Sequence, residues 1–254
     1  LVSAPDASTA QAVAGLLQSL VALAKTTSSQ FEFTIPRLVS ELRTMLSRCA
    51  ANGTDNAAID LACKLFASLE EAFGDAVVDE VNSCAAKCTG DTYSCVAEYV
   101  AQVSVDGSVV LEKIVAAAEH TLRRLVQVME SEGQRIVADA AISHMLGSPS
   151  SQPCIDASAA GRTPLLRITG AVITAISGNV SLDRCAELLT VLSGVVSWKP
   201  PATAVDARIA GQCLGSLFNK DTGTLTDTKR GVVESLSQAC QGVFHVCGLF
   251  FTSC

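Results

Sequence analysis

The sequence predicts an all-α protein, built as a helical bundle stapled by disulfides. Apolar residues recur at helical spacing along almost the whole chain, and no alternating period-2 run of any length appears. The chain also has eleven cysteines in 254 residues. Six of them stand four or seven residues apart, so that each set shares a helix face with Val and Leu residues. These sets are Cys84, Cys88 and Cys95, and Cys240, Cys247 and Cys254.

Apolar spacing divides the chain before residue 107 into five helical segments. Pro36 suits the first turn of a helix, and Gly90 is typical of a helix end. Either Thr54 or Asp55 can cap a further helix, which lies between Pro36 and Gly90 in the chain. We expect helices from about Thr9 to Lys25, Pro36 to Gly53, Asp55 to Gly74 and Asp75 to Gly90, and another after Asp91. Their core-facing residues include Leu16, Leu38, Val39, Leu42, Met45, Leu46, Cys49, Ile59, Ala62, Cys63, Phe66, Leu69, Cys84, Cys88, Cys95 and Tyr99.

The rest of the chain begins with a long helical pattern from Gly107 to Leu146, which we expect to bend near Gly133. The following stretch, Gly147 to Pro164, is rich in Ser, Ala, Gly and Pro and is typical of a linker. Further helices are expected from about Pro164 to Ser177, Ser181 to Trp198, Thr203 to Phe218 and Asp227 to Cys254. We therefore divide the chain into a bundle half at 1–146, a linker at 147–163 and a second bundle half at 164–254.

The two halves could be related to each other by an internal duplication. Cys63 and Cys213 lie 150 residues apart in similar helical segments, and Cys95 and Cys247 lie 152 residues apart. If the duplication is real, each half is a bundle of four or five helices with its own disulfides.

Composition and motifs exclude several classes of function. The net charge of −7 and the lack of any run of Lys or Arg argue against a nucleic-acid partner. No apolar stretch reaches the roughly 18 to 20 residues of a membrane span. The three histidines, His120, His144 and His245, lack a serine elbow, a zinc-binding helix motif or a Cys-x-x-Cys pair beside them. We therefore expect no enzymatic activity, no cofactor and no metal.

Disulfide bonding is the role we expect for the cysteines, which are Cys49, Cys63, Cys84, Cys88, Cys95, Cys154, Cys185, Cys213, Cys240, Cys247 and Cys254. Cys63 with one of the Cys84 to Cys95 set, and Cys213 with one of the Cys240 to Cys254 set, are the first choices. Because eleven is odd, at least one cysteine must be free or joined to another chain. Cys254 at the end of the sequence, Cys185 near a helix start and Cys154 in the linker are the candidates for an intermolecular bond.

The expected compartment is extracellular. Thiols at this density persist as disulfides only in oxidising surroundings, which indicates a secreted protein. Two candidate N-glycosylation sites favour the same compartment: Asn52 in Asn-Gly-Thr and Asn179 in Asn-Val-Ser. Both are expected at turns between helices.

Between residues 172 and 197, a Val/Ile/Ser helix leads through a short turn to a cysteine and a Leu/Val helix. The pattern comprises Val172 to Ser177, Asn179, Ser181 to Cys185 and Leu188 to Ser197. It resembles the carboxy-terminal domain of spider silk proteins. The resemblance implies a five-helix domain that dimerises and can cross-link two chains through Cys185. The chain departs from that family at Ala186, where an acidic residue is usual, and it has no Gly/Ala repeat tract.

Two functional hypotheses follow. The first is a secreted structural protein of a silk, capsule or adhesive, which assembles with itself or with another secreted structural protein through helix packing and disulfides. The alternative is an extracellular carrier that encloses a small apolar ligand between its helices. Low aromatic content, abundant Ala and an odd thiol favour the structural protein.

Overall fold

The computed structural model describes residues 15, 16, 19, 28–51, 55–73, 79–103, 109–146, 159–176 and 203–218. This part of the chain is helical and contains no strand, which confirms the all-α prediction. Its seven helices are α2 (Ser28–Ala51), α3 (Asn56–Phe73), α4 (Asp79–Gln102), α5 (Val109–Gln127), α6 (Ser131–Leu146), α7 (Ala159–Ala175) and α9 (Ala204–Phe218).

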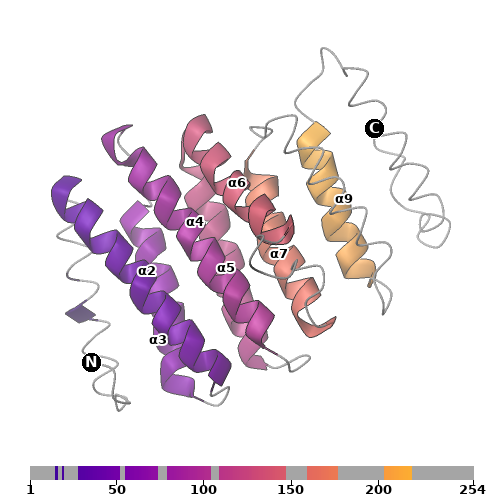
Figure 1. The fold of residues 1–254 in the computed structure, drawn as a ribbon, viewed down its shortest axis with the longest axis horizontal. Coiled ribbons are helices and arrows are strands. Elements are labelled where there is room, and N and C mark those ends of the chain that lie inside the picture. The colour runs from indigo at the N-terminus through magenta and orange to yellow at the C-terminus, as the bar shows by residue number, and fades with distance from the viewer. Residues whose placement is uncertain are drawn as a thin grey trace.

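These helices pack side by side in two rows (Figure 1). One row consists of α2, α4 and α6, and the other of α3, α5, α7 and α9, with each helix in contact with its neighbour in the row. The rows meet mainly where α2 packs on α3 and where α4 packs on α5 and α7. Helix α2 therefore lies at one end of the described array and α9 at the other (Figure 1).

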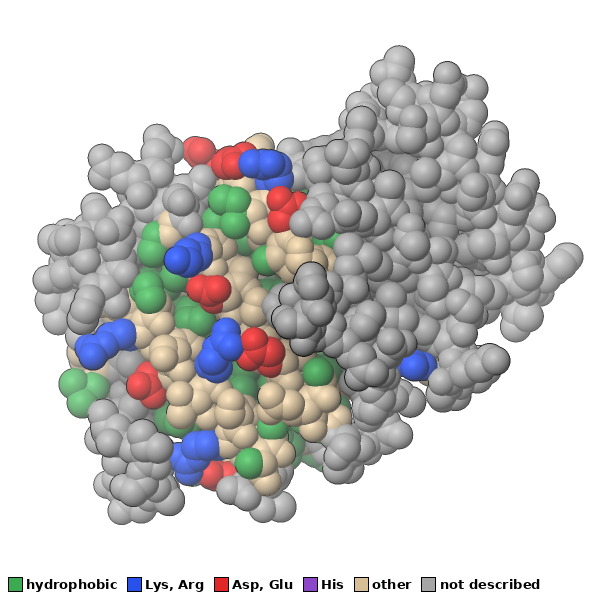
Figure 2. All heavy atoms as spheres, in the orientation of Figure 1, with side chains coloured by type: hydrophobic (Ala, Val, Ile, Leu, Met, Phe, Trp, Pro, Cys, Tyr) green, Lys and Arg blue, Asp and Glu red, His purple; other side chains and the backbone are tan. Residues whose placement is uncertain are grey.

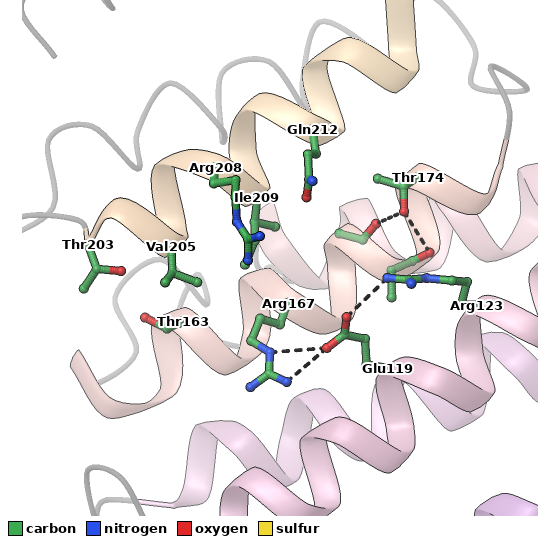
Figure 3. Close-up of a pocket in the computed structure, with 12 residues that line it drawn as sticks. Glu119, Arg123, Thr163, Arg167, Thr174, Thr203, Val205, Arg208, Ile209 and Gln212 are labelled. Carbon is green, nitrogen blue, oxygen red and sulfur yellow. Dashed lines mark hydrogen bonds and ion pairs between the residues drawn. The ribbon is translucent and has the colours of Figure 1, made fainter. Parts of the chain in front are cut away.

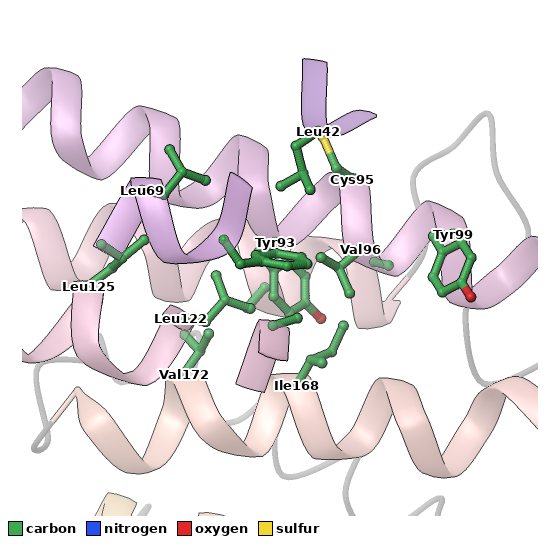
Figure 4. Close-up of a cluster of buried hydrophobic side chains, with 14 of the residues drawn as sticks. Leu42, Leu69, Tyr93, Cys95, Val96, Tyr99, Leu122, Leu125, Ile168 and Val172 are labelled. Atoms are coloured by element: carbon green, nitrogen blue, oxygen red, sulfur yellow. The ribbon is translucent and has the colours of Figure 1, made fainter. Parts of the chain in front are cut away.

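Aliphatic side chains dominate the described core, which also contains Phe66, Tyr93 and Tyr99. Tyr93 of α4 is 0% exposed and lies among Leu122, Ile168 and Val172 (Figure 4). Its hydroxyl oxygen is 2.7 Å from Thr169 Oγ1. Because the Thr169 hydroxyl donates its only proton to the Leu165 carbonyl at 2.8 Å, the Tyr93 hydroxyl is the donor to Thr169. A buried hydrogen bond thus joins α4 to α7.

Helix α2 begins earlier than we predicted. The proline was expected in its first turn, but the helix starts at Ser28 and Pro36 lies inside it. Pro36 is exposed, so its ring faces solvent, while Ile35 beside it is fully buried and anchors the turn before the proline. The predicted core stripe is confirmed, since the following residues are all buried: Leu38, Val39, Leu42, Met45, Leu46 and Cys49.

Asp55 caps α3, which confirms one of the two caps that we predicted. Its Oδ1 accepts a hydrogen bond of 3.0 Å from the backbone N–H of Ala58. Its other oxygen, Oδ2, is 3.0 Å from Nη2 of Arg48 in the last turn of α2. The same carboxylate therefore starts α3 and holds it to the end of α2.

The prediction that a helix ends at Gly90 is wrong. Helix α4 continues through Gly90 to Gln102 as a single element. Gly90 is buried, and a Cβ built there would lie 3.4 Å from the Cβ of Ala140 on α6. The glycine therefore lets α4 and α6 approach closely instead of ending the helix.

The single bent helix expected from Gly107 to Leu146 is also wrong, because the chain breaks between α5 and α6. The side-chain amide of Gln134 is buried there and donates to the carbonyls of Val126 at 3.2 Å and Met129 at 3.1 Å. They add to the backbone turn in which the Met129 N–H donates to the Val126 carbonyl at 3.3 Å, and they hold the junction between α5 and α6. Gly133, where we expected the bend, lies in the first turn of α6.

Helix α7 begins at Ala159, inside the predicted linker, and contains Pro164. Its Leu166 and Ile168 belong to the same buried cluster as the apolar residues of α2 to α6. The linker therefore joins helices that share one hydrophobic core. Helix α9 agrees with the segment predicted from Thr203 to Phe218.

Other predicted helices lie largely or wholly outside the described residues. Of the segment from Thr9 to Lys25, only residues 15, 16 and 19 are described, and they are helical. Leu16, which we expected on the apolar face of this segment, is 65% exposed. The segments from Ser181 to Trp198 and from Asp227 to Cys254 are not among the described residues.

Candidate functional site

The cysteines were the strongest candidates from the sequence. Six of them lie in the described helices, and none forms a disulfide with another: Cys49, Cys63, Cys84, Cys88, Cys95 and Cys213. The bond expected between Cys63 and the set on α4 is thus not formed. Helix α3 packs against α2 and α5, so Cys63 lies within electrostatic range of Cys49 and of Lys113 on α5.

Burial makes these thiols poor nucleophiles. Desolvation raises the pKa of the Cys49 and Cys95 thiols to about 11, and that of Cys213 to about 12. It also raises the pKa of Cys88, whose Sγ lies 4.0 Å from Cys84 Sγ one turn away on α4. A thiol must ionise before it attacks or ligates, so the buried cysteines act as core residues at neutral pH.

The remaining candidate residues do not form a site in the described part. Cys154, Cys185, Cys240, Cys247, Cys254, Asn52, Asn179 and His245 lie outside it, and His144 lies in α6. His120 is an exposed residue of α5, with its Nδ1 3.0 Å from Glu70 Oε2 on α3. His120 thus lies at the surface, beside a carboxylate of the neighbouring helix.

A cleft between α5, α7 and α9 was not predicted from the sequence. It has a volume of about 480 Å³ and combines four charged side chains with threonines, a glutamine and a few aliphatic residues (Figure 3). Its lining consists of Glu119, Arg123, Thr163, Arg167, Gly170, Ala171, Thr174, Thr203, Val205, Arg208, Ile209 and Gln212.

Ion pairs fix one wall of this cleft. Glu119 Oε1 accepts from Arg123 at 3.2 Å, and its Oε2 accepts from Arg167 Nη2 at 3.1 Å. Arg167 also binds both carboxylate oxygens of Glu112, at 2.7 and 2.8 Å. Burial lowers the pKa of Arg167, but the hydrogen bonds and charges of Glu112 and Glu119 outweigh it, so the net pKa is raised and the guanidinium stays charged.

Helix α9 forms the opposite wall and carries Arg208. Among the described residues, this guanidinium has no carboxylate partner, and Figure 3 shows its side chain directed from α9 toward α7. Gln212 lies one turn further along the same helix face. Arg208 and Gln212 thus place hydrogen-bond donors on this wall of the cleft.

A capping box and a glycine position α9. The Thr203 N–H and hydroxyl donate to Asp206 Oδ2 at 2.7 and 2.8 Å, and the Asp206 N–H donates back to Thr203 Oγ1 at 3.2 Å. The Thr-x-x-Asp pattern could have revealed this cap in the sequence. At Gly170 of α7, a Cβ would lie 2.7 Å from Ile209 Cγ2. Only glycine allows α7 and α9 this separation.

Charges of both signs mix on the surface. Figure 2 shows Lys and Arg side chains interspersed with Asp and Glu over the described part of one face. Ion pairs such as Arg43 with Glu98 at 2.6 Å and Lys113 with Asp60 at 2.8 Å bridge neighbouring helices. No described helix is both long and apolar enough to cross a membrane. Nor do the described residues contain a cluster of three or more His, Cys, Asp or Glu that could hold a metal ion.

The fold and the cleft define this chain as an all-α protein of two helical rows with an arginine-lined cleft at one end of the described array. Comparisons with protein-family models, with curated proteins and with solved structures found no match for it. Its function is therefore argued from its own residues.

Proposed function

We propose that the protein is a secreted helical structural protein, which assembles by helix packing and by intermolecular disulfides with itself or with another secreted structural protein. The observation that carries this proposal is a division among the cysteines. Of the six in the described helices, four are buried in the core and two, Cys63 and Cys84, are half-buried, whereas the five others all follow residue 146.

Thiol chemistry supports this division. Disulfide exchange needs a thiolate and access to it, and burial with a raised pKa denies both to Cys49, Cys88, Cys95 and Cys213. If the six described cysteines stay reduced, five remain, and five is again odd. At least one of them is then free or joined to another chain, and Cys154, Cys185 and Cys254 are the proposed positions.

A non-catalytic role is part of the proposal. His120, the one histidine whose side chain is described, is engaged by Glu70 at the surface. The carrier alternative gains less support from the structure. An apolar ligand in the described cleft would have to lie against Arg123, Arg167 and Arg208, and desolvation of guanidinium groups without compensation is unfavourable.

Electrophoresis of native full-length material with and without reductant tests the proposal. We expect a covalent oligomer that reductant converts to monomer. Cys154→Ser, Cys185→Ser and Cys254→Ser, made singly and together, identify the linking residue. Cys63→Ser, at a half-buried thiol of α3, is the matched control and should leave the oligomer intact. A monomer in both lanes contradicts covalent assembly and would favour the carrier.

A further inference from the structure

We propose that the cleft between α5, α7 and α9 binds a small organic anion, with the carboxylate or phosphate head on Arg208 and the carbon skeleton against Val205 and Ile209. This site is separate from the cysteines and goes beyond the structural role proposed above.

Charge in the cleft is the first argument. Three arginines line it and only one carboxylate, Glu119, does so. That carboxylate is already shared between Arg123 and Arg167, which leaves Arg208 without a counter-ion among the described residues. The chain as a whole has a net charge of −7, so a local excess of positive charge in a concave site attracts anions against the general trend of the surface.

Geometry on α9 is the second argument. Arg208 and Gln212 stand one turn apart and both line the cleft, so that one ligand head can reach both side chains. A guanidinium binds carboxylate or phosphate through two parallel N–H···O bonds, and the amide of Gln212 adds a further donor. Thr163 contributes a hydroxyl from the start of α7.

The opposite wall is held in place before a ligand arrives. Arg167 is fixed by four hydrogen bonds to Glu112 and Glu119, with its side chain only 22% exposed. The close contact of Gly170 with Ile209 sets the distance between the walls. A cleft built from such constrained side chains loses less entropy on binding than a flexible one does.

Size and apolar lining define the ligand further. A volume of about 480 Å³ lies within the range typical of sites for small molecules. Val205 is 44% exposed although it is a large aliphatic residue, and the half-buried Ile209 lies one turn further along the same helix. A ligand with a short hydrocarbon part would cover these side chains, whereas an inorganic ion would not. An amphipathic organic anion therefore fits better than a bare phosphate.

Calorimetric titration of the full chain with three probes tests the proposal: hexanoate, hexyl phosphate and inorganic phosphate. We expect saturable binding of at least one organic probe, and weaker binding of inorganic phosphate. The two organic probes show which head group the site prefers. Absence of saturable binding for both at millimolar concentration overturns the proposal. Inorganic phosphate binding as tightly as hexyl phosphate overturns the role given to Val205 and Ile209.

Two variants locate the binding. Arg208→Gln should lower the affinity for the organic probe at least tenfold, which is the loss typical of a charged hydrogen bond. Its matched control is Arg135→Gln, an exposed arginine of α6 that pairs with Glu132 and does not line the cleft. Gln212→Glu places a carboxylate at the exposed donor and should abolish binding without disturbing the core. Unchanged affinity in both cleft variants, with helicity retained, overturns the assignment.

Discussion

Buried cysteine acts as a small apolar side chain in this bundle. Cys88 and Cys95 lie on the core side of α4, and Cys213 lies beside Gly170 where α9 meets α7. A thiol fills such gaps at little cost because it is small and weakly polar. The consequence is a set of groups that are neutral in the folded protein at any pH near neutrality and that ionise only under alkaline conditions.

Alkaline pH should therefore weaken the fold. A thiol has an ordinary pKa of 9.0, and burial raises it to about 11 in Cys49 and Cys95 and about 12 in Cys213. Above pH 9 the unfolded chain loses these protons while the folded chain keeps them. The free energy of unfolding should then fall with pH, by up to about 1.4 kcal/mol per pH unit for each thiol. Stability from this source is complete below pH 9 and is lost as pH rises through 11 to 12.

Urea denaturation in the presence of reductant, repeated from pH 7 to about 11, measures this dependence. Cys213→Ala removes one ionising group and should make the decline between pH 9 and 11 shallower, even though it also lowers the stability at pH 7. An identical decline in the variant and in the original chain would contradict the role of that thiol.

Two glycines of the described helices lie at contacts between helices and not at helix ends. Gly90 lies within α4 against α6, and Gly170 lies within α7 against α9. Glycine in a helix lowers stability by about 1 kcal/mol relative to Ala, so each position needs a compensating contact. At Gly170 the neighbour is a methyl carbon of the β-branched Ile209, and there is no space for a further methyl group.

Gly170→Ala should lower stability by about 1 to 3 kcal/mol, because the new Cβ would meet Ile209 Cγ2 at 2.7 Å and push α9 away. Thermal denaturation followed by circular dichroism measures the loss. Gly15→Ala is the control, because a Cβ there meets nothing within 4 Å and should be neutral or slightly stabilising. Adding Ile209→Ala to Gly170→Ala removes the clashing carbon. If the double variant loses more free energy of unfolding than the two single variants lose together, the clash is not the cause.

Periodicity predicted the faces of the helices better than their ends. The buried stripe from Leu38 to Cys49 and the cap at Asp55 depend on residues close in sequence, which is why they could be predicted. The continuation of α4 through Gly90 depends on a partner helix, and the end of α5 depends on the side chain of Gln134. Neither leaves a periodic signal.

The arginine-lined cleft could not be predicted for a related reason. Arg123, Arg167 and Arg208 come from three helices, about 40 residues apart in the chain, and each reads as an ordinary surface residue in its own segment. Packing of α7 between α5 and α9 brings them together. Cysteine positions show the same limit, because helical spacing places a thiol on a face but does not place a partner within bonding distance.

At the scale of the molecule, α7 connects regions that the sequence separates into two halves. It packs against α4, α5 and α6 on one side and against α9 on the other. Its attachment is both apolar and polar, through the buried cluster, the Tyr93 to Thr169 hydrogen bond and the ion pairs of Arg167 with α5. Helices from both sides of the predicted linker therefore share one hydrophobic core in the described part of the chain.

This arrangement predicts that the fragment 1–146 does not fold stably alone. Removing α7 exposes the surface that its apolar face covers. This face is formed by Leu165, Leu166, Ile168, Val172 and Ile173, together with Ile176 just after the helix, and all six are buried. At about 1.5 to 3 kcal/mol for each side chain, the lost burial is on the order of 10 kcal/mol. That is comparable with the whole stability of a typical domain, about 5 to 15 kcal/mol.

Fragment 1–146 should therefore show no cooperative thermal transition, whereas fragment 1–176, which retains α7, should show one. Calorimetry of the two fragments beside the full chain makes the comparison. Cooperative melting of 1–146 near the temperature of the full chain would instead establish that the first half is an independent domain.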